Sequence, residues 1–164
     1  MTDDELISKY LRKSYFAVDG LWFMKVEEHR NFEEALVLDK QVWHILGKIQ
    51  ARRTIELLGI QSRTLGSLVA SLQVKFDAEE YRCRINDQEP GHIEIEISEC
   101  PWIELLKKAN RMEFAAQIAD AICPTDFSAW AREFDKAIEV KIPKRMCSGD
   151  PACLLILDKS EPSK

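Results

Sequence analysis

Four cysteines spread over the second half of the chain are the residues best suited to chemistry: Cys100, Cys123, Cys147 and Cys153. The first two each precede a proline, which favours extended backbone in the residue before it, so we expect both thiols at the ends of elements. The last two frame a short turn. Four thiolates suit a tetrahedral zinc ion or an iron–sulfur cluster. The pattern therefore predicts a metal site with these four ligands, zinc being preferred to an iron–sulfur cluster.

Two other interpretations of these thiols stay open, and both leave the protein without a metal cofactor. The spacing of Cys147 and Cys153 is looser than in common zinc knuckles, so the thiols could be buried and unligated. Redox or nucleophilic work is the other alternative, but a nucleophilic cysteine needs a nearby base. None of the 3 histidines is adjacent to these cysteines in the sequence. Cys83, in an alternating segment, is predicted to be a core residue of a strand.

A second candidate site combines aromatic and charged residues on the first two predicted helices. Its members are Trp22, Glu27, Asp39, Trp43 and Arg53. Aromatic walls with a few polar groups are typical of a small-molecule pocket, and a guanidinium group matches the shape of a carboxylate. The alternative is that the tryptophans pack in the core between two antiparallel helices.

The elements that must position these residues follow from the hydrophobic periodicity. Helix starts are predicted at Thr2, Asn31 and Thr64, with Gly59 ending the second helix and Asp19-Gly20 a candidate break in the first. Alternating segments predict strands at 80–86, 93–97, 138–142 and 154–157, and helices are predicted from Pro101, over 112–122, and from Thr125 or Asp126 to Phe134. We expect an α+β fold, in which long N-terminal helices pack on an antiparallel sheet of about four strands built from two hairpins.

Length, composition and charge limit the classes of protein to which this chain can belong. The 164 residues and 46% hydrophobic content predict a single domain over residues 1–158, followed by a frayed tail at 159–164. The net charge of −5 disfavours nucleic acid and anionic membrane as partners. The acidic start at Met1-Thr2-Asp3 does not resemble a signal peptide, so we expect a cytoplasmic protein with reduced thiols.

Several stretches resemble the proteins grouped as L-2-amino-thiazoline-4-carboxylic acid hydrolase-like. They are Val18 to Phe23, Val26 to Glu28, Ala35-Leu36 to Val42-Trp43, Arg52-Arg53 after Ala51, and the four cysteines with their Pro101 and Pro124 neighbours. The run from Cys147 to Leu154 also resembles the end of 4-vinyl-reductase domains. The resemblance implies an α+β fold that binds small molecules, is often dimeric and favours metal or hydrocarbon-like ligands.

Three functional hypotheses follow. The first is a small-molecule-binding domain with a cysteine-ligated metal, and the second is a hydrolase of a small cyclic amide or thiazoline carboxylic acid. In the second, a zinc-bound water, Cys147 or Cys153 would attack the substrate while Arg52 or Arg53 holds its carboxylate. The third is a homodimeric sensor or interaction module without metal. Gly-x-Ser-x-Gly and His-Glu-x-x-His motifs are absent from the sequence.

Overall fold

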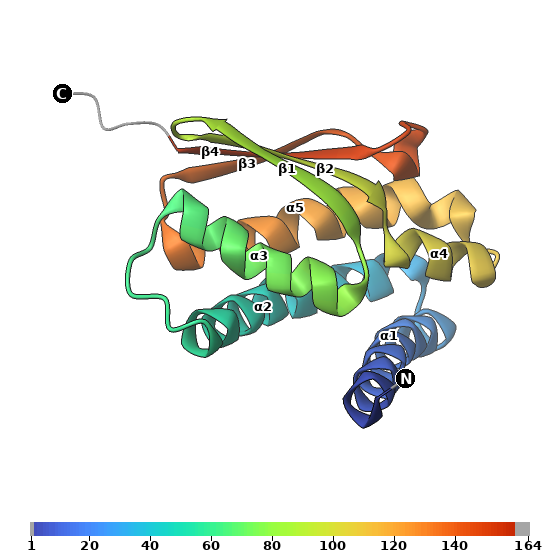
Figure 1. Ribbon diagram of the computed structural model, residues 1–164. Helices are drawn as coiled ribbons and strands as arrows, with labels where there is room; N and C mark the ends of the chain where they lie inside the picture. The colour runs from blue at the N-terminus through green and yellow to red at the C-terminus, as the bar shows by residue number, and fades with distance from the viewer. Residues whose placement is uncertain (1, 160–164) are drawn as a thin grey trace. The chain divides into compact units, whose positions relative to one another are not determined.

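The computed structural model describes residues 2–159, apart from the side chain of Gln88, and its fold is α+β as predicted (Figure 1). The helices are α1 (Asp3–His29), α2 (Phe32–Leu57), α3 (Leu65–Glu79), α4 (Pro101–Lys108) and α5 (Ala115–Phe134). The strands are β1 (Arg82–Glu89), β2 (His92–Glu99), β3 (Ile138–Lys144) and β4 (Cys153–Lys159). Two short 3-10 turns, η1 (Met112–Phe114) and η2 (Met146–Ser148), precede α5 and β4.

The three predicted helix starts are confirmed by their capping hydrogen bonds. The side-chain oxygens of Thr2, Asn31 and Thr64 accept from the backbone N–H three residues later, at 3.2, 2.8 and 3.1 Å. Each cap satisfies an N–H group that the first turn of a helix leaves without a partner. Asp19-Gly20 does not break α1, which continues to His29.

The sheet has the strand order β1-β2-β4-β3, with every neighbouring pair antiparallel. Both predicted hairpins are present, and β2 joins them by pairing with β4. Ile93, Ile95 and Ile97 are buried on one face of β2, whereas Glu96 between them is exposed. The sheet therefore has one apolar and one polar face, as alternation at a period of two residues requires.

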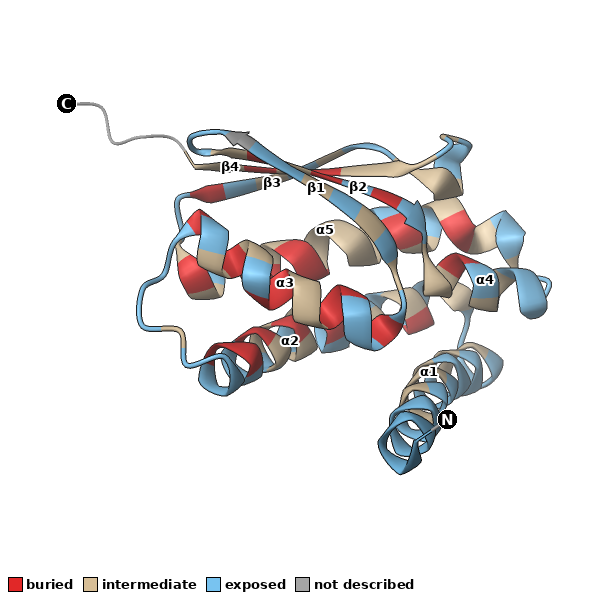
Figure 2. Ribbon diagram, viewed as in Figure 1, coloured by how far each residue is buried: buried red, intermediate tan, exposed pale blue. Residues whose placement is uncertain are grey.

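The apolar face of the sheet packs against helices in the main hydrophobic core (Figure 2). Side chains from the second half of α2, from α3 and from α5 join those of the strands in this core. Its largest fully buried members are Trp130, Phe76, Leu68, Leu72, Ile95, Leu155 and Leu157. Burial of each such side chain contributes roughly 1.5–3 kcal/mol to the stability of the fold. This core is therefore the rigid frame for any site built on its elements.

The chain divides into two compact units, up to Val42 and from Trp43 onward. In the first unit, which α1 and the start of α2 form, the Phe23 and Phe32 rings meet edge to face with centroids 5.6 Å apart. None of the α1 residues is buried, although all of α1 is described. All five cysteines, the sheet and the main core belong to the second unit.

Two sequence predictions about element boundaries are wrong. The helices predicted over 112–122 and from Thr125 or Asp126 are one helix, α5, with Pro124 inside it, so Cys123 lies in mid-helix and not at an element end. The helix continues because residues on both sides of Pro124 are buried. The free energy gained by their burial exceeds the cost of the backbone hydrogen bond that proline cannot donate. Lys159, the first residue of the predicted tail, belongs to β4, and residues 160–164 lie outside the described part.

No helix in the described range has an apolar stretch long enough to span a membrane.

Candidate functional site

The four predicted metal ligands come from four different elements of the second unit. Cys100 directly follows β2 and is the N-cap residue of α4, which Pro101 opens. Cys123 lies in the middle of α5, Cys147 lies in η2, and Cys153 is the first residue of β4. The four thiols are therefore held by the ends of two strands, the middle of a helix and a short turn.

The turn before β4 orients Cys153. Gly149 adopts a left-handed conformation with φ +100°, which is favourable for glycine because it has no Cβ. The turn brings the backbone N–H of Met146 to Cys153, where it donates to Sγ at 3.3 Å. Cys153 also pairs in register with Ile97, whose side chain is on the buried face of β2. The Cys153 thiol therefore lies on the core side of the sheet, beside a β2 residue that precedes Cys100 by three positions.

The four thiols form one electrostatically coupled group. Burial is the largest cause of a raised pKa in each of Cys100, Cys123, Cys147 and Cys153. Every pair within this set also interacts, since an ionised thiol raises the pKa of its neighbours. For Cys147, the combined effect raises the pKa to about 11. The thiols are therefore protonated at neutral pH unless a cation displaces their protons.

Tyr81 and the start of α4 complete the surroundings of Cys100. The N–H groups of Ile103 and Trp102 and the Tyr81 hydroxyl lower the pKa of Cys100 and oppose its burial, although Cys100 closes no side-chain cap hydrogen bond. The pKa of Tyr81 is itself raised by burial and by Cys100.

All five cysteines are free thiols. Over residues 2–159, no three Cys, His, Asp or Glu side chains are already arranged to hold a metal ion. The arrangement is a cluster of neighbouring protonated thiols, which must turn toward a common point before they can share a metal.

A buried charged centre, which the sequence analysis missed, lies in the same unit. The Lys75 ammonium is 2.9 Å from Glu79, 3.3 Å from Asp126 and 3.4 Å from the Gln50 amide oxygen. Lys75, Glu79 and Asp126 are only 4–5% exposed. Burial favours a lower pKa for Lys75, but the Asp126 and Glu79 carboxylates outweigh it and leave that pKa raised. Lys75 is therefore a buried ammonium ion between two carboxyl groups.

Tryptophans surround this charged centre. The Lys75 ammonium lies 5.2 Å from the ring of Trp43 and 6.0 Å from that of Trp130, within the range of cation–π attraction. Trp102 contacts Trp43 edge to face and donates its indole N–H to Glu79 at 3.3 Å. The centre is thus a cation enclosed by aromatic rings and carboxylates.

Asp126 connects the charged centre to the thiols. Burial raises the pKa of Asp126 although Lys75 opposes this effect, and Asp126 in turn raises the pKa of Cys123. Its Oδ1 atom and the indole N–H of Trp130 are buried without hydrogen-bond partners among the described residues. The sequence signal was available, because Lys75 and Glu79 continue the apolar stripe of α3 that Leu68 and Leu72 begin.

A glycine permits the close packing of α2 against Asp126. A Cβ at Gly47 would lie 2.7 Å from Asp126 Oδ1 and 3.0 Å from the Ala129 Cβ. We expect Gly47→Ala to lower the free energy of unfolding by about 1–3 kcal/mol, because the added methyl overpacks a buried contact. Gly20→Ala is the matched control, since nothing lies within 4 Å of its Cβ, and it should raise helix stability by about 0.5–1 kcal/mol. Urea unfolding of both variants checks this, and equal effects would contradict it.

The predicted small-molecule pocket is divided between the two units. Trp22, Glu27 and Asp39 belong to the first unit, and Trp43 and Arg53 to the second. Trp22 is 69% exposed, so it is not the core residue that the alternative interpretation expected, whereas Trp43 is buried at 3%. Arg53 is exposed. Trp43 contacts the charged centre, and the pocket as a set stays a prediction.

Comparison with known proteins places the chain in a family. Residues 2–153 match the family described as "Family of unknown function (DUF6125)". The chain belongs to the DUF6125 family. Among curated proteins nothing matches. One similar solved structure is a trafficking protein particle complex subunit 3 from Naegleria fowleri, covalently bound to palmitic acid. It has 14% identity and a TM-score of 0.57, with 96% of this chain and 97% of that chain covered, so the likeness concerns the fold.

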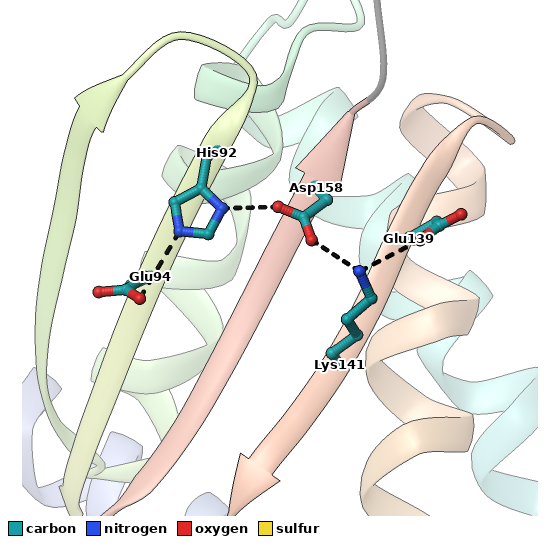
Figure 3. A network of polar contacts seen from close by, with 5 residues as sticks. All are labelled: His92, Glu94, Glu139, Lys141 and Asp158. Atoms are coloured by element: carbon teal, nitrogen blue, oxygen red, sulfur yellow. Dashed lines mark hydrogen bonds and ion pairs between the residues drawn. The ribbon is translucent and has the colours of Figure 1, made fainter.

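The polar face of the sheet in this DUF6125 chain carries a separate network of charges, centred on Asp158 of β4 (Figure 3). Asp158 accepts from His92 Nδ1 at 2.6 Å and from Lys141 Nζ at 3.0 Å. Glu94 lies 3.6 Å from His92 Nε2, and Glu139 lies 3.3 Å from Lys141. The network connects β2, β4 and β3 across the sheet. His92 lies at the start of β2 and is half-buried.

His92 makes the stability of the DUF6125 chain dependent on pH. The hydrogen bond to Asp158 is the largest cause that raises the pKa of His92 above its usual 6.5. Stabilisation by protonated His92 is therefore fully present below about pH 6.5 and is lost as pH rises through the raised value.

We expect Asp158→Asn to lower the pKa of His92 toward its usual value and to flatten this pH dependence. NMR titration of the His92 ring, with urea unfolding between pH 5 and 9, measures both effects. Glu96→Gln on an exposed position of β2 is the control. An unchanged His92 titration in Asp158→Asn would contradict the assignment.

Proposed function

We propose that this DUF6125 chain is a metal-binding domain in which Cys100, Cys123, Cys147 and Cys153 hold a zinc ion. The observation that carries the proposal is that these half-buried thiols, from four separate elements, raise one another's pKa. Thiolates are the ligands of structural zinc sites, and four of them complete a tetrahedron. An iron–sulfur cluster would use the same ligand set.

The surroundings of the thiols support thiolate binding. The Met146 N–H already donates to Cys153, and a donor of this kind stabilises sulfur best when it is ionised. Metal binding would release the thiol protons, turn the side chains toward one point and compensate the repulsion between the resulting thiolates. A cytoplasmic setting, where thiols stay reduced, is part of the proposal.

The hydrolase alternative, and with it the thiazoline hydrolase resemblance, needs an open metal position and therefore three protein ligands. Four thiolates leave no such position, so the ligand count decides between the two proposals. Small-molecule binding stays a prediction that the tryptophans around Lys75 support. A homodimer is supported by the exposed apolar side chains of α1, among them Tyr10 and Trp22 at 69%.

Metal analysis and cobalt binding test the proposal. Protein purified without added metal should contain about one zinc per chain, and Co²⁺ added to the metal-free chain should give the intense absorption of a tetrahedral thiolate site. Cys100→Ser and Cys123→Ser should each weaken this absorption, whereas Cys83→Ser, which alters the fifth cysteine on β1, should leave it unchanged. Free titration of all thiols in the native protein, with no bound metal, would refute the proposal.

A further inference from the structure

The helix α1 carries an exposed apolar face, which lies entirely within the first compact unit. Ile7, Leu11, Ser14, Val18 and Leu21 follow one another at alternating spacings of four and three residues. They therefore line one face of the helix, which we call the α1 seam. The four apolar members of the α1 seam are 55% to 59% exposed, and α1 is described in full with none of its residues buried (Figure 2). An exposed apolar face of this kind marks a surface that binds a partner.

The spacing of the α1 seam favours a second copy of the same helix as that partner. Alternating steps of four and three residues are those of a coiled-coil interface. The seam has nearly the same order of steps on either side of Ser14, so it is close to symmetric about that residue. An antiparallel copy centred on Ser14 would bring Ile7 near Leu21 of the second copy. The same alignment brings Leu11 near Val18 of the second copy, so that one surface covers itself around a two-fold axis.

The charges at the two ends of the α1 seam favour the antiparallel orientation. The first turn of α1 is acidic, with Asp3, Asp4 and Glu5. Lys25 continues the seam at its other end, and Asp3 and Lys25 are equally far from the centre of the seam. Lys25 pairs with Glu28 of its own helix, but both side chains are more than half exposed, so Lys25 can also reach the acidic turn of a second copy. A parallel pair would instead place the acidic turns side by side and align the two helix dipoles.

The size of the exposed face sets the strength of the pair. A helix of 27 residues is about 40 Å long, and one face of it offers fewer residues than the roughly 20–30 that a standard interface uses on each side. Val37, Leu38 and Val42 at the start of α2, in the same unit, are exposed as well and enlarge the apolar surface. We therefore expect a weak dimer with a micromolar dissociation constant.

We propose that the α1 seam pairs with the α1 seam of a second copy in antiparallel orientation, and that this pair is the dimer interface of the chain. The inference rests on the homodimer proposed above and assigns it a surface and an orientation. It is independent of the metal site, because all four thiols belong to the second unit.

Sedimentation velocity of the full chain, with a chelator present to exclude bridging by metal, tests the inference. Leu11→Glu alone and Val18→Lys alone should each raise the dissociation constant of the dimer roughly 100-fold or more, because the symmetric pair carries the unpaired charge twice. Lys9→Glu is the matched control. Lys9 is exposed on the side of α1 opposite the seam, so this variant should dimerise as the wild type does.

A mixture of the two variants tests the orientation and excludes a folding defect as the cause of a lost dimer. In an antiparallel heterodimer, the introduced carboxylate faces the introduced ammonium, while the unchanged Leu11 of one chain faces the unchanged Val18 of the other. The mixture should therefore regain most of the lost affinity. In a parallel pair, position 11 faces position 11 and position 18 faces position 18, so no charge pair forms and the mixture stays monomeric.

The possible failures are distinguishable. A dimer that persists in Leu11→Glu would overturn the assigned surface and leave the homodimer in place. A mixture that stays monomeric would overturn the antiparallel pairing. A wild-type chain that is monomeric at high micromolar concentration would overturn the homodimer and this inference together, and the metal site would stand or fall by the cobalt experiment alone.

Discussion

Lys75→Met is expected to lower the free energy of unfolding by about 3–5 kcal/mol, because it leaves buried carboxyl groups without their counter-charge. Glu79 and Asp126 are 5% exposed, and both contact the Lys75 ammonium. Without it, each must bind a proton or remain as an unpaired buried charge. Urea unfolding at pH 7 measures the loss.

The control for this substitution is Lys107→Met. Lys107 pairs with Glu104 at 2.7 Å on α4, but both side chains are more than half exposed, so the change should stay within about 0.5 kcal/mol. Lys75→Met combined with Glu79→Gln and Asp126→Asn should recover part of the loss, because it removes the unpaired charges. A single substitution as mild as the control would show that Lys75 does not hold the centre together.

Zinc is expected to stabilise the folded chain by a free energy that grows with the logarithm of the zinc concentration above the dissociation constant. At 100 times that constant, binding contributes about 2.7 kcal/mol, which for a chain of this size raises the melting temperature by about 5–11 °C. Removal of the metal with a chelator should reverse the shift, which differential scanning fluorimetry can follow.

Magnesium is the matched ion control, since it prefers oxygen ligands and should produce no shift. Cys123→Ser should abolish the zinc response, because its thiol is the one that α5 contributes. Cys83→Ser should preserve the response. A zinc response that survives Cys123→Ser would place the ion at another site.

Local sequence patterns predicted most of the fold because they act over a few residues. Thr2, Asn31 and Thr64 cap their helices as expected, since a cap bond spans only three residues. The alternation of Ile93, Ile95 and Ile97 likewise identified the central strand. Such features can be derived without knowledge of the tertiary contacts.

The errors arose where tertiary packing overrides local preference. Pro124 indicated a helix boundary, but the buried face of α5 continues through it to Trp130. Lys75 was overlooked because a charged residue is normally solvated, whereas here two carboxylates and two indoles compensate its burial. Trp22 was expected to pack in the core between the first two helices in the alternative to a pocket, and it is exposed.

The pairing of β2 with β4 has a consequence for the order of folding. Each hairpin joins two strands that are near in the sequence. Ile93 can pair with Leu157 only after the helices between them in the sequence have been synthesised. Such long-range closure is slow because the chain loses entropy before the contact repays it. Cys153 enters the thiol group only through this last strand, so we expect a chain still emerging from the ribosome to hold Cys100 and Cys123 without their partners. Assembly of the complete thiol group would then mark the end of folding.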